Sequence, residues 1–281
     1  MTNTLFALGA AIAGLTATGA QAANILNPGT GAPYALSSTD YTQNFNSMKA
    51  TSLDTIPANT LPAGWQAYES GTGANGTYQF GSSSSNTSGV WSYGSGTDRA
   101  LGGHAATEVS LMYVGAIFEN ALGGTIDSLA LSYTGEQWQN GFNRATMTFQ
   151  YSLDATSIDT GTWTSVSGLN FVAPNTAVHA GSQFGISSTN GNTAAFRAQV
   201  SGLLGGLSIG AGDTFGLRWT LVDIDGPGVT SDDGLAIDDF RLTATVAPVP
   251  EPASWAMMVG GFGLIGGALR RRAAGPRTAN A

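Results

Sequence analysis

The chain has 281 residues, of which 40 are glycine, and Lys49 is the only lysine. It has no cysteine, which excludes disulfides, thiol nucleophiles and zinc–thiolate sites, and its scarcity of helix-favouring residues favours strands joined by tight turns. Residues 23–249 hold six basic and 17 acidic side chains, a net charge of about −11, which argues against binding of DNA or RNA.

The N-terminal segment is typical of a secretion signal. Residues 5–20 form an apolar run that ends in the small-x-small pattern Ala20-Gln21-Ala22, and signal peptidase is expected to cut before Ala23. No Lys or Arg precedes the run, so either translation starts upstream or the basic region is weak. We therefore expect a signal peptide over residues 1–22, with signal peptidase as a partner.

Residues 23–247 are predicted to form one all-β domain. Apolar and polar residues alternate over 129–133, 146–151, 196–200 and 215–221, the period of two of strands with one buried face. Asn-Gly pairs separate these runs, as expected of tight turns, and no amphipathic stretch of helical length stands out. The pattern predicts a jelly-roll-like antiparallel β-sandwich.

Two catalytic patterns in this domain lack the context that their chemistry needs. Residues 71–76 fit G-x-G-x-x-G, but a strand-like sequence follows where a dinucleotide site needs a helix. Residues 206–210 fit G-x-S-x-G, but His104 and His179 both precede Ser208, against the Ser, acid, His order of α/β-hydrolases. The two histidines are also too far apart to give metal spacing, and we assign no catalytic residue.

Trp138 is the tryptophan with the most polar neighbours, in the segment 136–140. Aromatic faces offer flat apolar area on which a sugar ring can stack, so Trp138 and Glu136 are our predicted ligand residues. Glu108 and Glu119 are further acids for an enzyme that cleaves glycosidic bonds, but no spacing selects a pair among these carboxylates.

Aspartates are concentrated near the end of the domain, around a Gly-Pro loop. Hard cations such as Ca²⁺ prefer several carboxylate and carbonyl oxygens, and a cation would relieve the repulsion between these charges. We predict that one structural Ca²⁺ binds here and that no other cofactor is required; the alternative is a solvated turn. The candidate ligands are Asp223, Asp225, Asp232, Asp233, Asp238 and Asp239.

The last strand of the domain changes phase. Leu235 and Ile237 are two residues apart, as are Phe240 and Leu242, but the two pairs are out of step by one residue. A β-bulge near 238–239 would place all four side chains on one face. Because a bulge re-aims side chains, one aspartate there is expected to point toward a ligand or toward backbone amides.

Five segments of the domain resemble a module found in secreted bacterial surface proteins, sometimes beside nuclease or phosphatase domains. The resemblance spans roughly residues 40–245. It implies a jelly-roll sandwich similar to lectin and carbohydrate-binding modules, and an extracellular location. The segments that carry it are 98–102, 135–138, 149–152, 217–219 and 234–240.

The C-terminal segment, residues 248–281, has three parts. The uncharged stretch 253–269 has 17 residues, the lower limit for a membrane-spanning helix, and a basic tail follows over 270–281. By the positive-inside rule the basic tail stays cytoplasmic, so the body would lie outside the inner membrane. The residues that define the pattern are Pro250, Glu251, Pro252, Trp255, Ala256, Arg270, Arg271 and Arg272.

This arrangement resembles the PEP-CTERM sorting signal in its PEPxxWA variant. The resemblance implies an exosortase as partner, a membrane cysteine protease-transpeptidase of Gram-negative bacteria that make exopolysaccharide. The tail would then be cut and the body released or transferred to the envelope. A permanent C-terminal anchor is the alternative.

Two functions fit this sequence. One is a non-enzymatic envelope or matrix protein that binds glycan, with exopolysaccharide as the partner. The other is a secreted hydrolase or lyase acting on glycans. A purely adhesive structural role is a third alternative. An open groove with two facing carboxylates would favour the enzyme, and a filled sandwich would favour the binding protein.

Overall fold

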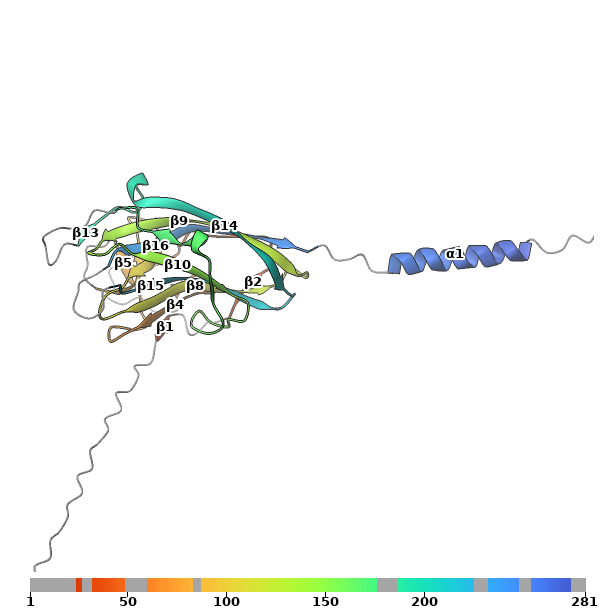
Figure 1. Ribbon diagram of the computed structural model, residues 1–281, viewed down its shortest axis with the longest axis horizontal. Coiled ribbons are helices and arrows are strands. Elements are labelled where there is room, and N and C mark those ends of the chain that lie inside the picture. The colour runs from red at the N-terminus through yellow and green to blue at the C-terminus, as the bar shows by residue number, and fades with distance from the viewer. Residues whose placement is uncertain are drawn as a thin grey trace, which may run out of the picture.

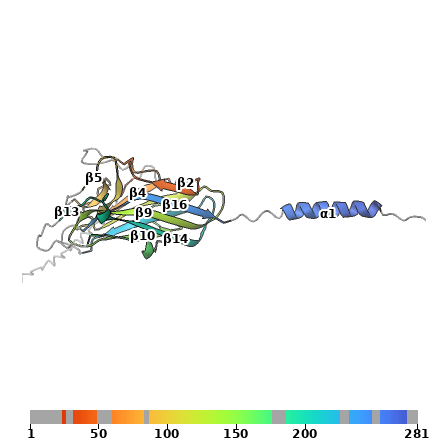
Figure 2. The same cartoon turned by 90° about the horizontal axis from the view of Figure 1, so that it is seen from above.

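The computed structural model describes residues 24–26, 32–48, 60–82, 87–175, 186–224, 232–247 and 254–273. Within these residues the strands form two sheets packed face to face, as Figure 1 shows, which confirms the predicted β-sandwich. Seen from above in Figure 2, the long strands run along the long axis of the body. The predicted signal peptide and its cleavage site lie outside the described residues and stay predictions.

The first sheet, the lower layer in Figure 1, has the order β1-β4-β8-β15-β10-β11. Its partners pair antiparallel, except that β2 joins β8 in parallel, and β12 pairs with the other end of β10. The strands are β1 (Asn24–Leu26), β2 (Tyr34–Leu36), β4 (Trp65–Ser70), β8 (Leu111–Asn120), β10 (Thr146–Ser152), β11 (Thr164–Ser165), β12 (Phe171–Val172) and β15 (Thr214–Val222).

The second sheet, the upper layer, has the order β13-β9-β16-β7-β6-β5. In addition, β14 pairs along one edge of β9, and β3 pairs with β16 beyond β7. The strands are β3 (Asp40–Gln43), β5 (Gln79–Gly81), β6 (Gly89–Tyr93), β7 (Ala100–His104), β9 (Ile126–Asn140), β13 (Ser187–Ser188), β14 (Arg197–Ile209) and β16 (Gly234–Val246).

Aromatic side chains fill the space between the two sheets. The indole of Trp219 lies 6.2 Å from that of Trp65 and 5.7 Å from the ring of Phe240, and all three are at most 1% exposed. Burial of such large side chains is the main source of stability in a chain without disulfides. The sandwich is therefore filled between its described layers, so a ligand cannot bind between the two sheets.

The predicted bulge is present in β16. The register between β16 and β9 shifts between Asp238 and Arg241, and Asp239 has a positive φ of 48°. The apolar residues on both sides of the bulge are fully buried in the main core, as expected from their spacing: Leu235, Ile237, Phe240 and Leu242. The bulge thus corrects the phase of the strand and leaves Asp239 exposed.

The segments 129–133, 146–151 and 215–221 form strands as predicted, within β9, β10 and β15. The segment 196–200 differs in part: β14 begins at Arg197, whereas Phe196 belongs to a 3₁₀ turn and is not buried. Ala198 is exposed rather than buried, on a strand that pairs, within the described residues, with β9 alone. Two short 3₁₀ turns, Ser167–Leu169 and Ala194–Phe196, lie in the connections.

A helix forms where the sequence predicts one: α1 runs Ser254–Ala273. In the part of the chain that the structure describes, no helix is both long and apolar enough to cross a membrane. The prediction of a transmembrane helix over 253–269 is therefore corrected. The physical reason lies in composition, since α1 contains five glycines and three arginines, which lower its mean hydropathy.

Candidate functional site

A polar groove crosses the outer face of the second sheet. Its main part has a volume of about 520 Å³, and an adjoining part of about 280 Å³ continues over β14. Gln199 and Asp239 line both parts, so the two form one continuous depression across β3, β16, β9 and β14. The remaining lining residues are Thr42, Gln43, Asn44, Ser132, Thr134, Ala194, Arg197, Ala198, Phe240 and Arg241.

The alternation of β9 supplies the floor of this groove. Ser132 and Thr134 face outward, whereas Leu131 and Tyr133 on the same strand point into the core. The amide of Gln199 on β14 donates a hydrogen bond to the Thr134 hydroxyl at 2.6 Å, which orients both side chains at the surface. The floor is thus made of hydroxyl and amide groups held by two paired strands.

The β16 bulge adds a carboxylate to this surface. Asp239 lies in the left-handed backbone region, which costs a non-glycine residue roughly 1–3 kcal/mol unless its surroundings hold it there. Its backbone N–H donates to the Asp238 carboxylate at 2.6 Å, and this bond stabilises the bulge. The buried Phe45 has a similar φ of 52°, so it is the exposure of the Asp239 carboxylate in the groove that makes it a candidate site residue.

Two buried carboxyl groups lie next to the groove residues on β9 and β16. Glu136 and Asp238 are 1% and 5% exposed, and they stand on neighbouring strands. Burial raises the pKa of Glu136 to about 7, opposed by the hydrogen bond from Trp138, and raises the pKa of Asp238 to about 8. The charges of the two carboxyls also repel each other, so at neutral pH this pair holds at least one proton.

Trp138 is packed inside the protein. Its indole is 1% exposed, stacks on Tyr93 at 6.1 Å, and donates from Nε1 to the Glu136 carboxylate at 2.8 Å. Trp91 continues the stack, 5.4 Å beyond Tyr93. A Cβ on Gly191 would lie 2.5 Å from the indole nitrogen, so the chain at 191 closes directly over the ring. In this conformation neither Trp138 nor Glu136 offers a surface to a ligand.

The aspartates proposed for calcium do not converge. Among the described residues, no group of three or more His, Asp or Glu side chains is placed to hold a metal ion. Asp232 accepts hydrogen bonds from Asn143 and from the backbone of Ile224, whereas Asp239 lines the groove and Asp238 accepts its backbone N–H. Asp223 is partly exposed, and Asp225 lies outside the described residues. The calcium ion therefore stays a prediction without a described site.

Asp233 has a structural role. Its two carboxylate oxygens accept the backbone N–H groups of Gly141 at 2.7 Å and Ala145 at 3.1 Å. These bonds fix the turn that joins β9 to β10. Burial raises the pKa of Asp233 to about 6, although the two backbone N–H groups favour the charged form and oppose this shift.

The remaining candidate motifs carry no catalytic geometry. Residues 71–76 lead to β5, and residues 206–210 lie at the end of β14, so neither stands before a helix. His104 is fully buried, which lowers its pKa to about 4, and its Nδ1 lies 3.4 Å from the Tyr93 hydroxyl. His179 lies outside the described residues.

The C-terminal segment matches a known family. The match covers residues 248–272 and has the description PEP-CTERM protein-sorting motif. Residues 248–272 are a PEP-CTERM sorting motif. This confirms the resemblance, and the motif implies export, exosortase processing and transient membrane anchoring during sorting. Trp255, Ala256 and Arg270–Arg272 of the PEP-CTERM motif lie on α1, and Pro250–Pro252 lies outside the described residues.

Other comparisons concern the sandwich that precedes the PEP-CTERM motif. No curated protein matches the sequence. One similar solved structure is TmCBM61 in complex with β-1,4-galactotriose, with a TM-score of 0.28 and 11% identity over 53% of this chain and 72% of that one. Another is the CBM22-1 and GH10 modules of Clostridium thermocellum endo-1,4-β-D-xylanase 10B with xylohexaose, with a TM-score of 0.24 and 13% identity over 56% of this chain and 24% of that one.

Proposed function

We propose that this is an exported protein of the bacterial cell envelope or extracellular matrix, and that its sandwich binds glycan in the groove above the β16 bulge. The sorting motif supports the location. The observation that carries the binding function is Asp239, an exposed carboxylate held by strained backbone in a groove of amide and hydroxyl groups. Such groups match the hydroxyls of a sugar chain, which donate and accept hydrogen bonds.

The proposed location includes both ends of the chain. Signal peptidase would remove residues 1–22, an exosortase of a Gram-negative cell would cut the tail, and exopolysaccharide would be the partner outside the inner membrane. We expect mass spectrometry of the protein from its native envelope to show a mature N-terminus at Ala23 and no residue beyond the motif at 248–272. Recovery of an intact C-terminus at Ala281 would instead show that the tail is not cut.

Filling the groove should abolish glycan binding. Ser132 lies in its floor, in the middle of β9, so the indole of Ser132→Trp would occupy the space that a sugar chain needs. We expect the full chain, in mild detergent, to be retarded by at least one polysaccharide in affinity electrophoresis against xylan, dextran, alginate and polygalacturonate. Ser132→Trp should remove that retardation.

The matched control for this experiment is Ser128→Trp. Ser128 lies on the same strand, four residues before Ser132 and on the same face, and does not line the groove. It should leave the retardation unchanged. If no polysaccharide in the panel retards the wild-type chain, or if both variants behave alike, the proposed binding function is wrong.

The geometry favours binding over glycan cleavage. Hydrolysis of a glycosidic bond uses two carboxyl groups on opposite sides of the bond. Among the described residues that line the groove, Asp239 supplies the one carboxylate, and Glu136 and Asp238 are buried and do not line it. The hydrolase or lyase expected as the alternative therefore lacks a facing pair in the described part of this surface.

A further inference from the structure

The free positive charge of the described body is concentrated at the groove. Three of its arginines donate to main-chain carbonyl groups and serve the fold: Arg99, Arg144 and Arg218. The other two, Arg197 and Arg241, line the groove from its two sides. Residues 23–249 carry a net charge of about −11. Both arginines that serve no described contact in this acidic domain nevertheless lie at the groove.

Both groove arginines are available to a ligand. Arg197 and Arg241 are exposed, and neither guanidinium group has a hydrogen bond or ion pair to any residue in the described ranges. Arg197 is nevertheless close enough to Glu136 that its charge lowers the pKa of that carboxyl, against the larger effect of burial. A guanidinium offers a planar set of N–H donors that fits a carboxylate with two parallel hydrogen bonds.

The strand register sets the distance between the two cations. Arg197 pairs with Glu136 on one edge of β9, and Arg241 pairs with Ser132 on its other edge. Four residues along a strand span about 13 Å, and two strand spacings add about 10 Å across the sheet, so the two backbone positions lie on the order of 16 Å apart. An occupant that reaches both arginines therefore has to be an extended chain with charges some distance apart.

We propose that the groove binds an acidic glycan, a chain of sugars with carboxylate groups, which pair with Arg197 and Arg241. This inference rests on the proposed function and specifies its ligand class. Asp239, between the two arginines, contacts hydroxyl groups of the uncharged part of the chain.

The experiment compares an acidic with a neutral oligosaccharide of equal length. Tetragalacturonate and cellotetraose are titrated calorimetrically into the full chain in mild detergent, at about 50 mM and about 500 mM salt. We expect tetragalacturonate to bind, more weakly at high salt, and cellotetraose not to bind. Arg197→Gln and Arg241→Gln should each weaken binding about tenfold, the expected effect of losing a charged hydrogen bond.

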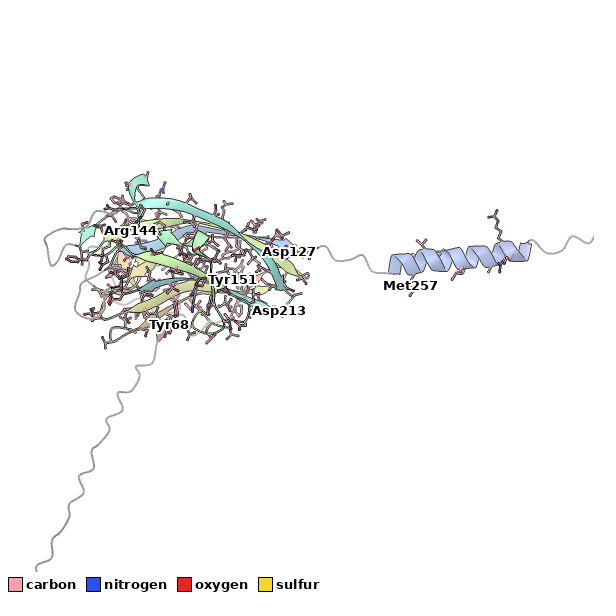
Figure 3. The ribbon with its side chains drawn as sticks, in the orientation of Figure 1. Tyr68, Asp127, Arg144, Tyr151, Asp213 and Met257 are labelled. Carbon is pink, nitrogen blue, oxygen red and sulfur yellow. The ribbon has the colours of Figure 1, made fainter. Side chains whose placement is uncertain are left out.

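The matched control is Arg144→Gln, which changes the net charge equally but lies outside the groove, at the end of the body marked in Figure 3. It should alter the affinity by less than about twofold, and the melting temperatures should show that all three variants fold. Equal binding of cellotetraose, unaffected by both groove substitutions, would overturn the acidic ligand but leave glycan binding in place. Binding of neither oligosaccharide, nor of any polysaccharide in the panel, would overturn both proposals.

Discussion

Asp238→Asn should make the protein more stable at alkaline pH and flatten the dependence of its stability on pH. The Asp238 carboxyl is buried beside Asp239, and burial raises its pKa in the folded protein to about 8 from an ordinary value of 3.8. The unfolded chain ionises this group near the ordinary value, so the protonated carboxyl stabilises the fold fully below that pH. This stabilisation is lost as the pH rises toward about 8.

Asparagine mimics the protonated acid at every pH and keeps an oxygen to accept the Asp239 N–H. The stability gained should be small near pH 4 and grow to roughly 5 kcal/mol by about pH 8.5, which corresponds to an increase in melting temperature of about 10–20 °C. Thermal unfolding followed by circular dichroism across this range measures it. Glu136 and Asp233 have raised pKa values as well, so a smaller pH dependence should remain.

The control for this prediction is Asp127→Asn, near the start of β9. Asp127 accepts a hydrogen bond from the neighbouring Ser128 and, as Figure 3 shows, lies toward the end of the body away from Arg144. This variant should keep the wild-type pH profile. If the melting temperatures of wild type and Asp238→Asn changed in parallel from acidic to alkaline pH, Asp238 would not be protonated in the folded protein.

Arg218→Ala should cost about 3 kcal/mol of stability. The Arg218 guanidinium lies 3.9 Å from the ring centre of Tyr113 and 4.1 Å from that of Trp163, and its Nη1 donates to the Ile158 carbonyl at 2.6 Å. Through these contacts one side chain on β15 holds the segment 153–163 against the outer face of the first sheet. Alanine removes them together and leaves a buried carbonyl without its donor.

Urea unfolding measures the global effect, and hydrogen exchange of the backbone N–H groups over 155–163 measures the local one. Exchange in this segment should accelerate more than in β15 itself. Arg218→Lys should recover little, because an ammonium group cannot stack between two rings and donate to Gln150 and Ile158 at once. If exchange over 155–163 stays slow in Arg218→Ala, the apolar contacts of Ile158 and Ala155 hold the segment instead.

The strands and the bulge could be predicted because their signals are local. Alternation over 146–151 and 215–221 reflects one buried face, and the phase change around 238–239 has a single economical explanation in an antiparallel sheet. The sorting motif is also local, since its residues are contiguous. Each of these features is determined by residues that are close together in the sequence.

The ligand residues could not be predicted in this way. Trp138 has polar neighbours in sequence, but the surrounding segments that bury it, including Gly191, come from elsewhere in the chain. Aspartates that are close in sequence separate in space, because Asp233 turns to the amides of the β9–β10 connection while Asp239 faces the groove. Long-range pairing decides both outcomes.

The groove shows the same limit. Arg197 and Arg241 come to line the same groove only through their shared partner β9, a relation that no spacing in the sequence reveals. The sequence shows that basic residues are few, but it does not show where in the fold they lie. The C-terminal segment gave a different error. The apolar side chains of 253–269 suggested a membrane-spanning helix, but glycines and arginines of the same helix lower its mean hydropathy.

The position of β16 has a mechanical consequence. This strand ends at Val246, just before the sorting motif, and it lies inside its sheet, paired with β9 on one side and with β7 and β3 on the other. Tension applied through the tail therefore runs along a strand whose ladder bonds stand across the direction of the force. Those bonds are loaded in shear and share the load, so the domain withstands pulling at its tethered end far better than a domain tethered through an edge strand that can be peeled away.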